Sequence, residues 1–202
     1  GSFGAGKSYL ISAMLNELAK KGYQSVIIFY PDFLRSLKEN FNGDFEKALN
    51  NYNHALRIYK TYKESDKQIC TYISMAKICI SNEIYAQSIE YANKSLEVLS
   101  EIYGNDTLFH IPAYQVIGEA YYKLGKYDIA AGWIDKSISI TKTTFGEYSY
   151  RLGGLYTDLA HIFSSLKNYK KALEYYIESN NIISSIYGEV HPSLVNNYLG
   201  LG

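Results

Sequence analysis

An excess of charge of either sign is missing from this sequence, whose 202 residues include 20 Lys and Arg against 20 Asp and Glu. The balance gives no electrostatic reason to expect a nucleic acid or an anionic membrane as the main partner. Long hydrophobic runs are missing too, since the longest, residues 26–30, is far too short to cross a bilayer. The N-terminus is rich in glycine and lacks an apolar segment of signal-peptide length. We therefore expect a cytoplasmic protein.

Cysteine is scarce, with only Cys70 and Cys79 in the chain. On one helix the two would lie about 13 Å apart along the axis, too far for a disulfide. Two free thiols suit a reducing compartment. The histidines lack the spacing of a metal site or a catalytic set: His54, His110, His161 and His191. We therefore expect no metal site and no enzymatic activity.

Tyrosine, by contrast, is abundant, with 22 copies, and aromatic residues recur at a fixed period. A spacing of 42 residues separates three aromatic–glycine pairs: Tyr103-Gly104, Phe145-Gly146 and Tyr187-Gly188. The same spacing relates three tyrosines that are each followed three positions later by a small residue, Tyr85, Tyr127 and Tyr169, and Phe45 with Ala48 makes the same pair one unit earlier. Two independent markers with one period indicate an array of structural repeats.

Each period reads as two helices. Residues 113–124 carry apolar side chains at helical spacing, Gly125 breaks the helix, and residues 127–141 form the second one. The inner face of that second helix is expected to carry Ala130, Ala131, Ile134 and Ile138. The next unit repeats the pattern with Tyr156, Leu159, Ala160 and Phe163, a turn at Lys167-Asn168, and then Tyr169, Ala172, Leu173 and Tyr176. Small residues at fixed places in the pattern allow close helix approach.

The repeat resembles the tetratricopeptide family. Its third unit carries most of the family's signature, with Tyr114, Ile117, Gly118, Tyr121, Ala130 and Ser137. The longer period and the segments IYGNDTL, TFGEYSY and IYGEVHP are similar to the kinesin-light-chain type. The resemblance covers residues 43–202. It implies an all-α, right-handed solenoid of four helix pairs over residues 42–202, with a C-terminal capping helix that begins near Pro192.

Residues 1–41 follow a different pattern. GSFGAGKS, residues 1–8, satisfies the phosphate-loop motif, in which Gly4 and Gly6 would let backbone amides surround phosphates, Lys7 would contact the β- and γ-phosphates and Ser8 would bind Mg²⁺. A helix over Lys7–Lys20, a strand over Ser25–Tyr30 and a helix over Asp32–Asn40 are expected to follow.

This N-terminal stretch resembles the start of the ATPase module in DnaI-type helicase loaders, up to about Phe41. The strand before the loop, the acidic strand end that would hold Mg²⁺, and the sensor and arginine-finger segments have no counterpart in the sequence. We therefore expect a vestigial loop, no ATP or Mg²⁺ cofactor unless the fragment functions, and a chimeric origin. The strand would leave an unpaired edge, through which a homodimer could form.

The family resemblance implies that the first helix of each unit lines a concave face. The repeat register then predicts a peptide groove formed by Ile73, Lys77, Gln115, Glu119, Tyr122, Thr157, His161 and Asn196. The Lys and Asn set with which relatives clamp a terminal carboxylate is absent. The predicted function is a non-enzymatic scaffold that binds a protein or peptide. The alternatives are an ATP-binding module with an appended repeat sensor and a recombined chimera without natural function.

Overall fold

The computed structural model describes residues 45–188 and 191–201, and residues 49–202 form one compact unit. The expected phosphate loop, the helices over Lys7–Lys20 and Asp32–Asn40, the strand over Ser25–Tyr30 and the homodimer edge all lie outside the described residues. The predicted domain boundary after residue 41 lies there as well.

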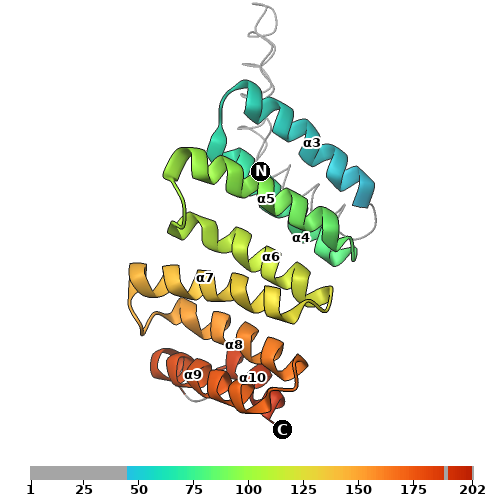
Figure 1. Ribbon diagram of the computed structural model, residues 1–202. Coiled ribbons are helices and arrows are strands. Elements are labelled where there is room, and N and C mark those ends of the chain that lie inside the picture. The colour runs from blue at the N-terminus through green and yellow to red at the C-terminus, as the bar shows by residue number, and fades with distance from the viewer. Residues whose placement is uncertain (1–44, 189–190, 202) are drawn as a thin grey trace, which may run out of the picture. The chain divides into compact units, whose positions relative to one another are not determined.

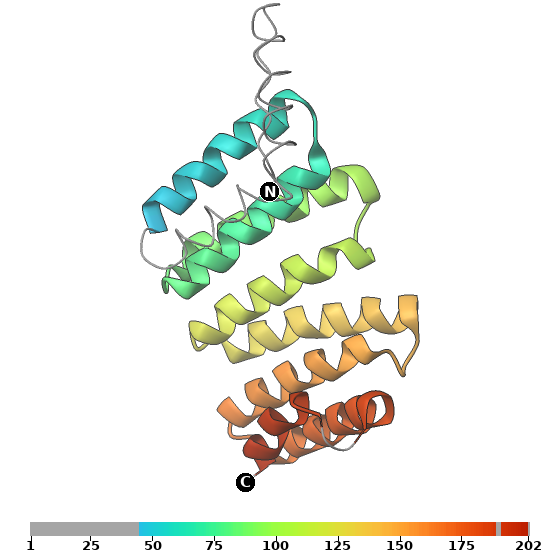
Figure 2. The same cartoon turned by 180° about the vertical axis from the view of Figure 1, so that it is seen from behind.

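The described chain is built from helices joined by short connections (Figures 1 and 2). These helices are α3 (Phe45–Thr61), α4 (Ser65–Ser81), α5 (Tyr85–Tyr103), α6 (Ile111–Lys123), α7 (Tyr127–Phe145), α8 (Tyr150–Ser165), α9 (Tyr169–Tyr187) and α10 (Ser193–Leu201), with a 3₁₀ turn over Leu108–His110. Helices α4 and α5, α6 and α7, and α8 and α9 pair as antiparallel hairpins, and α10 packs on α9. The predicted all-α solenoid of helical hairpins is confirmed.

One hydrogen-bond pattern closes each hairpin. The backbone N–H of Ile84 donates to the Cys79 carbonyl at 2.8 Å, and Lys126 and Asn168 make the same bond to Tyr121 and Phe163 at 2.9 Å. A residue with positive φ precedes the donor in every case: Glu83, Gly125 or Lys167. This closure satisfies carbonyl groups that the end of a helix leaves unpaired. The predicted turns at Gly125 and at Lys167-Asn168 are therefore confirmed.

The aromatic–glycine pairs mark the ends of the second helices. Gly104, Gly146 and Gly188 end α5, α7 and α9 with φ values of 74°, 83° and 86°. Residues that carry a Cβ atom rarely adopt such positive φ values. The aromatic residue before the glycine then contacts a side chain that follows the connection. Tyr103 meets Phe109 with ring centroids 4.5 Å apart, and the Arg151 guanidinium lies 4.9 Å from the Phe145 ring centroid. In each aromatic–glycine pair the glycine therefore ends the second helix, and the aromatic side chain packs against the connection that follows.

The small residues allow neighbouring helices to approach closely. Ala76, Ser88, Ala130, Ala160 and Ala172 are all buried. A Cβ atom added at Gly118 would lie 2.9 Å from Cδ1 of Ile134, so a larger residue there would push α6 away from α7. The predicted inner face of α7 is confirmed, since Ala130, Ala131, Ile134 and Ile138 are buried together.

The predicted inner face of α9 is wrong at two positions. Tyr169 and Leu173, in the first turns of that helix, are exposed. Among the described residues no element covers these first turns, whereas Gly200 of α10 lies against the Tyr176 ring further along α9. The core of this last hairpin instead uses Tyr176, Ile182 and Ile183.

Candidate functional site

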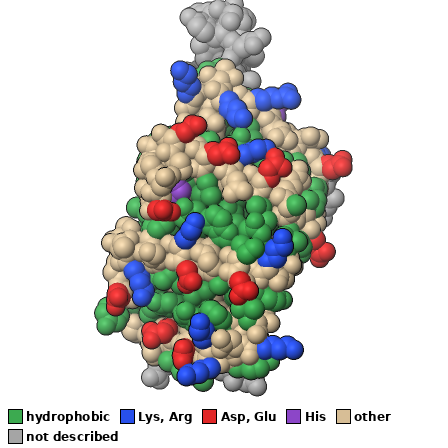
Figure 3. All heavy atoms as spheres, in the orientation of Figure 1, with side chains coloured by type: hydrophobic (Ala, Val, Ile, Leu, Met, Phe, Trp, Pro, Cys, Tyr) green, Lys and Arg blue, Asp and Glu red, His purple; other side chains and the backbone are tan. Residues whose placement is uncertain are grey.

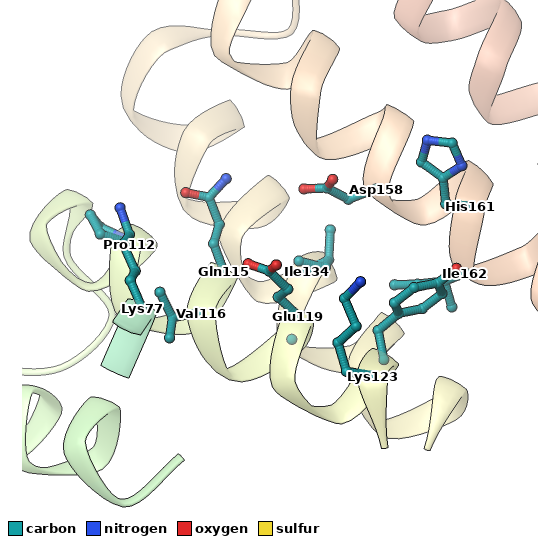
Figure 4. A pocket seen from close by; sticks show the side chains of 12 residues that line it. Lys77, Pro112, Gln115, Val116, Glu119, Lys123, Ile134, Asp158, His161 and Ile162 are labelled. Atoms are coloured by element: carbon teal, nitrogen blue, oxygen red, sulfur yellow. The ribbon is translucent and has the colours of Figure 1, made fainter. Parts of the chain in front are cut away.

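A groove of about 560 Å³ opens along the first helices of the hairpins (Figure 4). Helix α4 contributes one residue to its wall, α6 most of the others, α7 its floor and α8 the opposite wall. The lining residues are Lys77, Pro112, Gln115, Val116, Gly118, Glu119, Tyr122, Lys123, Ile134, Asp158, His161 and Ile162. Five residues that the repeat register predicts for a groove are brought together here: Lys77, Gln115, Glu119, Tyr122 and His161.

The other three predicted positions lie elsewhere. Ile73 is half-buried and packs against the cluster of Ala76, Ala92, Val116 and Ile117. Thr157 is directed towards α9 and α10, through the hydrogen bonds described next. The side chain of Asn196 falls outside the described residues.

Thr157 belongs to a polar cluster that ties α10 to the array. Its hydroxyl donates to Oδ1 of Asn197 at 2.8 Å and lies 2.9 Å from the hydroxyl of Ser179. The Asn197 amide nitrogen in turn donates to Ser179 and to Asn180, each at 2.8 Å. Because Asn197 and Ser179 are buried, these bonds satisfy groups that have no access to water. Thr157 therefore holds the last helix in place.

Two aromatic groups form one end of the groove. The Tyr122 ring is half-buried and packs 5.5 Å from the Tyr127 ring, and its hydroxyl accepts a hydrogen bond from Ser165 at 3.1 Å. Nδ1 of His161 lies 2.9 Å from the Tyr176 hydroxyl. Burial lowers the pKa of His161, so this imidazole is neutral near neutral pH. This end of the groove is consequently aromatic, with a neutral imidazole beside the Tyr122 ring.

Two carboxylates face each other in the middle of the groove. Glu119 comes from α6 and Asp158 from α8, and both point into the space between those helices (Figure 4). The Asp158 carboxylate is accessible to water, but the groove removes part of its hydration. This desolvation, together with the smaller effect of the Glu119 charge, raises the pKa of Asp158 to about 7. Among residues 45–188 and 191–201 neither carboxylate forms an ion pair.

The repeat register missed Asp158, Lys123 and Ile162. Asp158 and Ile162 each follow a predicted position of α8 by one residue, and both line the groove, whereas Thr157 is directed towards α9 and α10. One signal in the sequence could have identified the acid pair: Asp158 and Glu119 are the only acidic residues on α8 and α6. A carboxylate that is the one acidic residue of its helix is a candidate functional group.

Asp158→Asn is expected to stabilise the protein above pH 7 and to have little effect near pH 4. The ordinary pKa of 3.8 applies to the unfolded chain, whereas the folded protein keeps the proton up to about pH 7. Between these values only the folded state holds the proton, so wild-type stability falls as the pH rises, and it stays lower above pH 7. Melting temperatures of both proteins from pH 4 to pH 8 measure the difference.

The control is Glu97→Gln, which removes one negative charge from an exposed position on α5. A melting-temperature gain for Asp158→Asn that is equal at pH 4 and pH 8, or equal to that of Glu97→Gln, would contradict the assigned environment of Asp158.

The described residues were also compared with the requirements of a metal site and of a membrane-spanning helix. No group of three His, Cys, Asp or Glu side chains is placed to hold a metal ion in residues 45–188 and 191–201. No described helix is both long enough and apolar enough to span a membrane. Cys79 is buried and Cys70 exposed, and each is a free thiol. On the face seen in Figure 3, charged side chains of both signs are scattered without an extended patch of one sign.

Comparison with protein families identifies the repeats. Residues 67–143 and residues 153–187 each match the tetratricopeptide repeat. A clustered mitochondria protein homolog of Candida albicans is 27% identical over 125 residues, which cover 62% of this chain and 9% of that protein. The replicative helicase loader DnaI of Bacillus subtilis is 43% identical over 51 residues, 25% of this chain and 16% of that protein. So short a match leaves the loader resemblance of residues 1–41 a hypothesis.

Solved structures share the fold at low sequence identity. The apo form of RapI superposes with a TM-score of 0.72 at 17% identity, covering 94% of this chain and 51% of that one. A putative kinesin light chain of P. anserina gives 0.66 at 15% identity over 86% of each chain. A Rap protein complexed with Competence and Sporulation Factor gives 0.63 at 19% identity, covering 86% of this chain and 48% of that one.

Proposed function

We propose that this chain binds an extended segment of another protein in the groove along α4, α6 and α8. Residues 67–143 and 153–187 match the tetratricopeptide repeat, and such repeats make the chain a protein-interaction scaffold. One observation carries this proposal. Side chains of three successive first helices, from Lys77 on α4 to His161 on α8, line a single groove.

The dimensions and lining of the groove suit a short run of peptide. A volume of about 560 Å³ holds a few side chains of a peptide. Val116, Ile134 and Ile162 give it an apolar floor, while Gln115 offers an amide that can hydrogen-bond a peptide backbone. The Rap structure with Competence and Sporulation Factor illustrates that a solenoid of this fold can hold a ligand.

Tyr122 is the expected anchor of the interaction. Large aromatic residues in half-buried positions dominate many interfaces, because they bury much area at little cost in side-chain entropy. A peptide selected on the full chain from a display library of random nine-residue sequences provides the probe. We expect Tyr122→Ala to weaken binding of that peptide by about tenfold or more in fluorescence anisotropy. His161→Ala should also weaken it, since this imidazole lines the same end of the groove.

Tyr148→Ala is the matched control, because Tyr148 is 88% exposed in the connection between α7 and α8. Equal affinities of the Tyr122→Ala and wild-type proteins, with both folded by circular dichroism, would place the peptide elsewhere and overturn the proposal. Failure to select any peptide on the wild-type chain would do the same.

A further inference from the structure

The carboxylates of Glu119 and Asp158 form a pair of like charges to which no group in residues 45–188 or 191–201 supplies an ion-pair partner. They approach from opposite walls, and the charge of Glu119 is felt at Asp158. Such an arrangement is unfavourable in the empty protein, because desolvation and mutual repulsion both oppose ionisation. A cation placed between the two carboxylates would remove the repulsion and offset the cost of desolvation by direct attraction.

The other charged groups around the groove do not neutralise Glu119 and Asp158. Lys77 lies on α4, Lys123 follows Glu119 by one helical turn, and α7 contributes only the apolar Ile134. His161 of α8 is neutral near neutral pH, since burial lowers its pKa. Within the described residues neither Lys77 nor Lys123 makes an ion pair with either carboxylate. A pairing of Lys123 with Glu119 along α6 would be a weak surface pair and would leave Asp158 unmatched.

We propose that Glu119 and Asp158 bind the side chain of an arginine in the segment that occupies the groove. This inference rests on the proposed function and names the chemistry of the partner: an extended peptide with a basic residue. The planar guanidinium presents several N–H donors in a fixed fork, so it can donate to carboxylates on two walls at the same time. A lysine ammonium group, a compact and strongly hydrated charge, fits such a two-sided site less well.

The surroundings of the pair fit the rest of an arginine side chain and its neighbour. Tyr122 and Ile162 lie towards the aromatic end and can pack against aliphatic groups of the peptide. Gln115, one helical turn before Glu119, supplies a further acceptor. A metal ion is a poorer occupant than a guanidinium, because two carboxylates with no third acidic, histidine or cysteine ligand among the described residues make an incomplete metal site.

Binding of such a peptide should strengthen as the pH rises from 6 to 8. The carboxyl group of Asp158 keeps its proton up to about pH 7 in the empty protein, so a guanidinium must first displace that proton at lower pH. The other titratable groups that line the groove are Glu119 and Lys123 of α6, His161 of α8 and Lys77 of α4, and of these the charge of Glu119 raises the pKa of Asp158. The Asp158→Asn protein separates this effect from the titration of His161. A pH dependence of binding that arises from Asp158 is lost in this variant, whereas one that arises from His161 is kept.

The experiment compares arginine with citrulline, its uncharged near-isostere. The full chain is used to select nine-residue peptides from the random library, and each arginine of the best binder is replaced in turn by citrulline. We expect arginine to be enriched among the selected peptides and one citrulline replacement to weaken binding about tenfold or more in wild-type protein. In Glu119→Gln/Asp158→Asn protein the same replacement should have no effect, whereas Glu97→Gln protein should behave as wild type.

The outcomes separate this inference from the proposed function. Selected peptides that depend on Tyr122 but show no arginine enrichment, or that tolerate citrulline at every position, would keep the groove and overturn the arginine site. A citrulline effect that persists in the Glu119→Gln/Asp158→Asn protein would place the arginine elsewhere and also overturn it. Absence of any peptide that depends on Tyr122 would overturn the proposed function itself.

Discussion

Leu159→Ala is expected to lower the free energy of unfolding by about 3–4 kcal/mol. Leu159 is 0% exposed and lies at the centre of the cluster that α7, α8 and α9 share. The substitution removes apolar contacts and leaves a cavity that the stacked helices can close only in part. Urea denaturation followed by circular dichroism measures the loss.

Ile177→Ala serves as the aliphatic control, because Ile177 is 46% exposed on the outer side of α9. It should change the free energy of unfolding by about 0.5 kcal/mol or less. Similar losses in the two variants would mean that the inward faces of α8 and α9 are assigned wrongly.

Asn197→Ala is expected to cost about 2–3 kcal/mol, because it breaks the polar cluster beneath α10. The Asn197 side chain is 0% exposed, and its loss removes one hydrogen-bond partner from each of Thr157, Ser179 and Asn180. A terminal helix of a repeat array can detach without unfolding the remainder. Faster amide hydrogen exchange in α10, with little change in α6 and α7, is therefore the expected signature.

Thr157→Ser provides the comparison, since it keeps the hydroxyl that donates to Asn197. This variant should retain most of the protection of α10, whereas Thr157→Val should lose it. Unchanged hydrogen exchange in the Asn197→Ala protein would show that α10 is held by apolar contacts such as those of Leu194 alone.

The helical hairpins could be predicted from the sequence because each periodic marker has a physical role. The aromatic–glycine pairs end the second helices with a positive φ at glycine, and the small residues at positions such as Ala130 permit close helix approach. Where the pattern failed, at Tyr169 and Leu173, the cause was not local. Whether those side chains are buried depends on which elements pack over the first turns of α9, which no property of α9 itself determines.

The groove was predictable in part for the same reason. The repeat register identified rows of residues such as Lys77, Glu119 and His161, which the structure brings together. It could not identify Asp158, because the rotation of α8 against α6 decides which of two adjacent residues faces the groove. Nor could it show that the Thr157 hydroxyl is engaged by Asn197, a residue forty positions later in the sequence. Both features arise from packing between elements rather than from periodicity.

Photo-crosslinking tests directly whether the groove along α4, α6 and α8 binds a peptide. A peptide selected on the full chain carries a benzophenone beside its anchoring residue, and mass spectrometry locates the attachment. Crosslinks should fall within residues 112–123 and 158–162, which line the groove, and Tyr122→Ala should suppress them. Crosslinks confined to the exposed faces of α5, α7 or α9 would show that the peptide binds outside the groove and would contradict the proposed function.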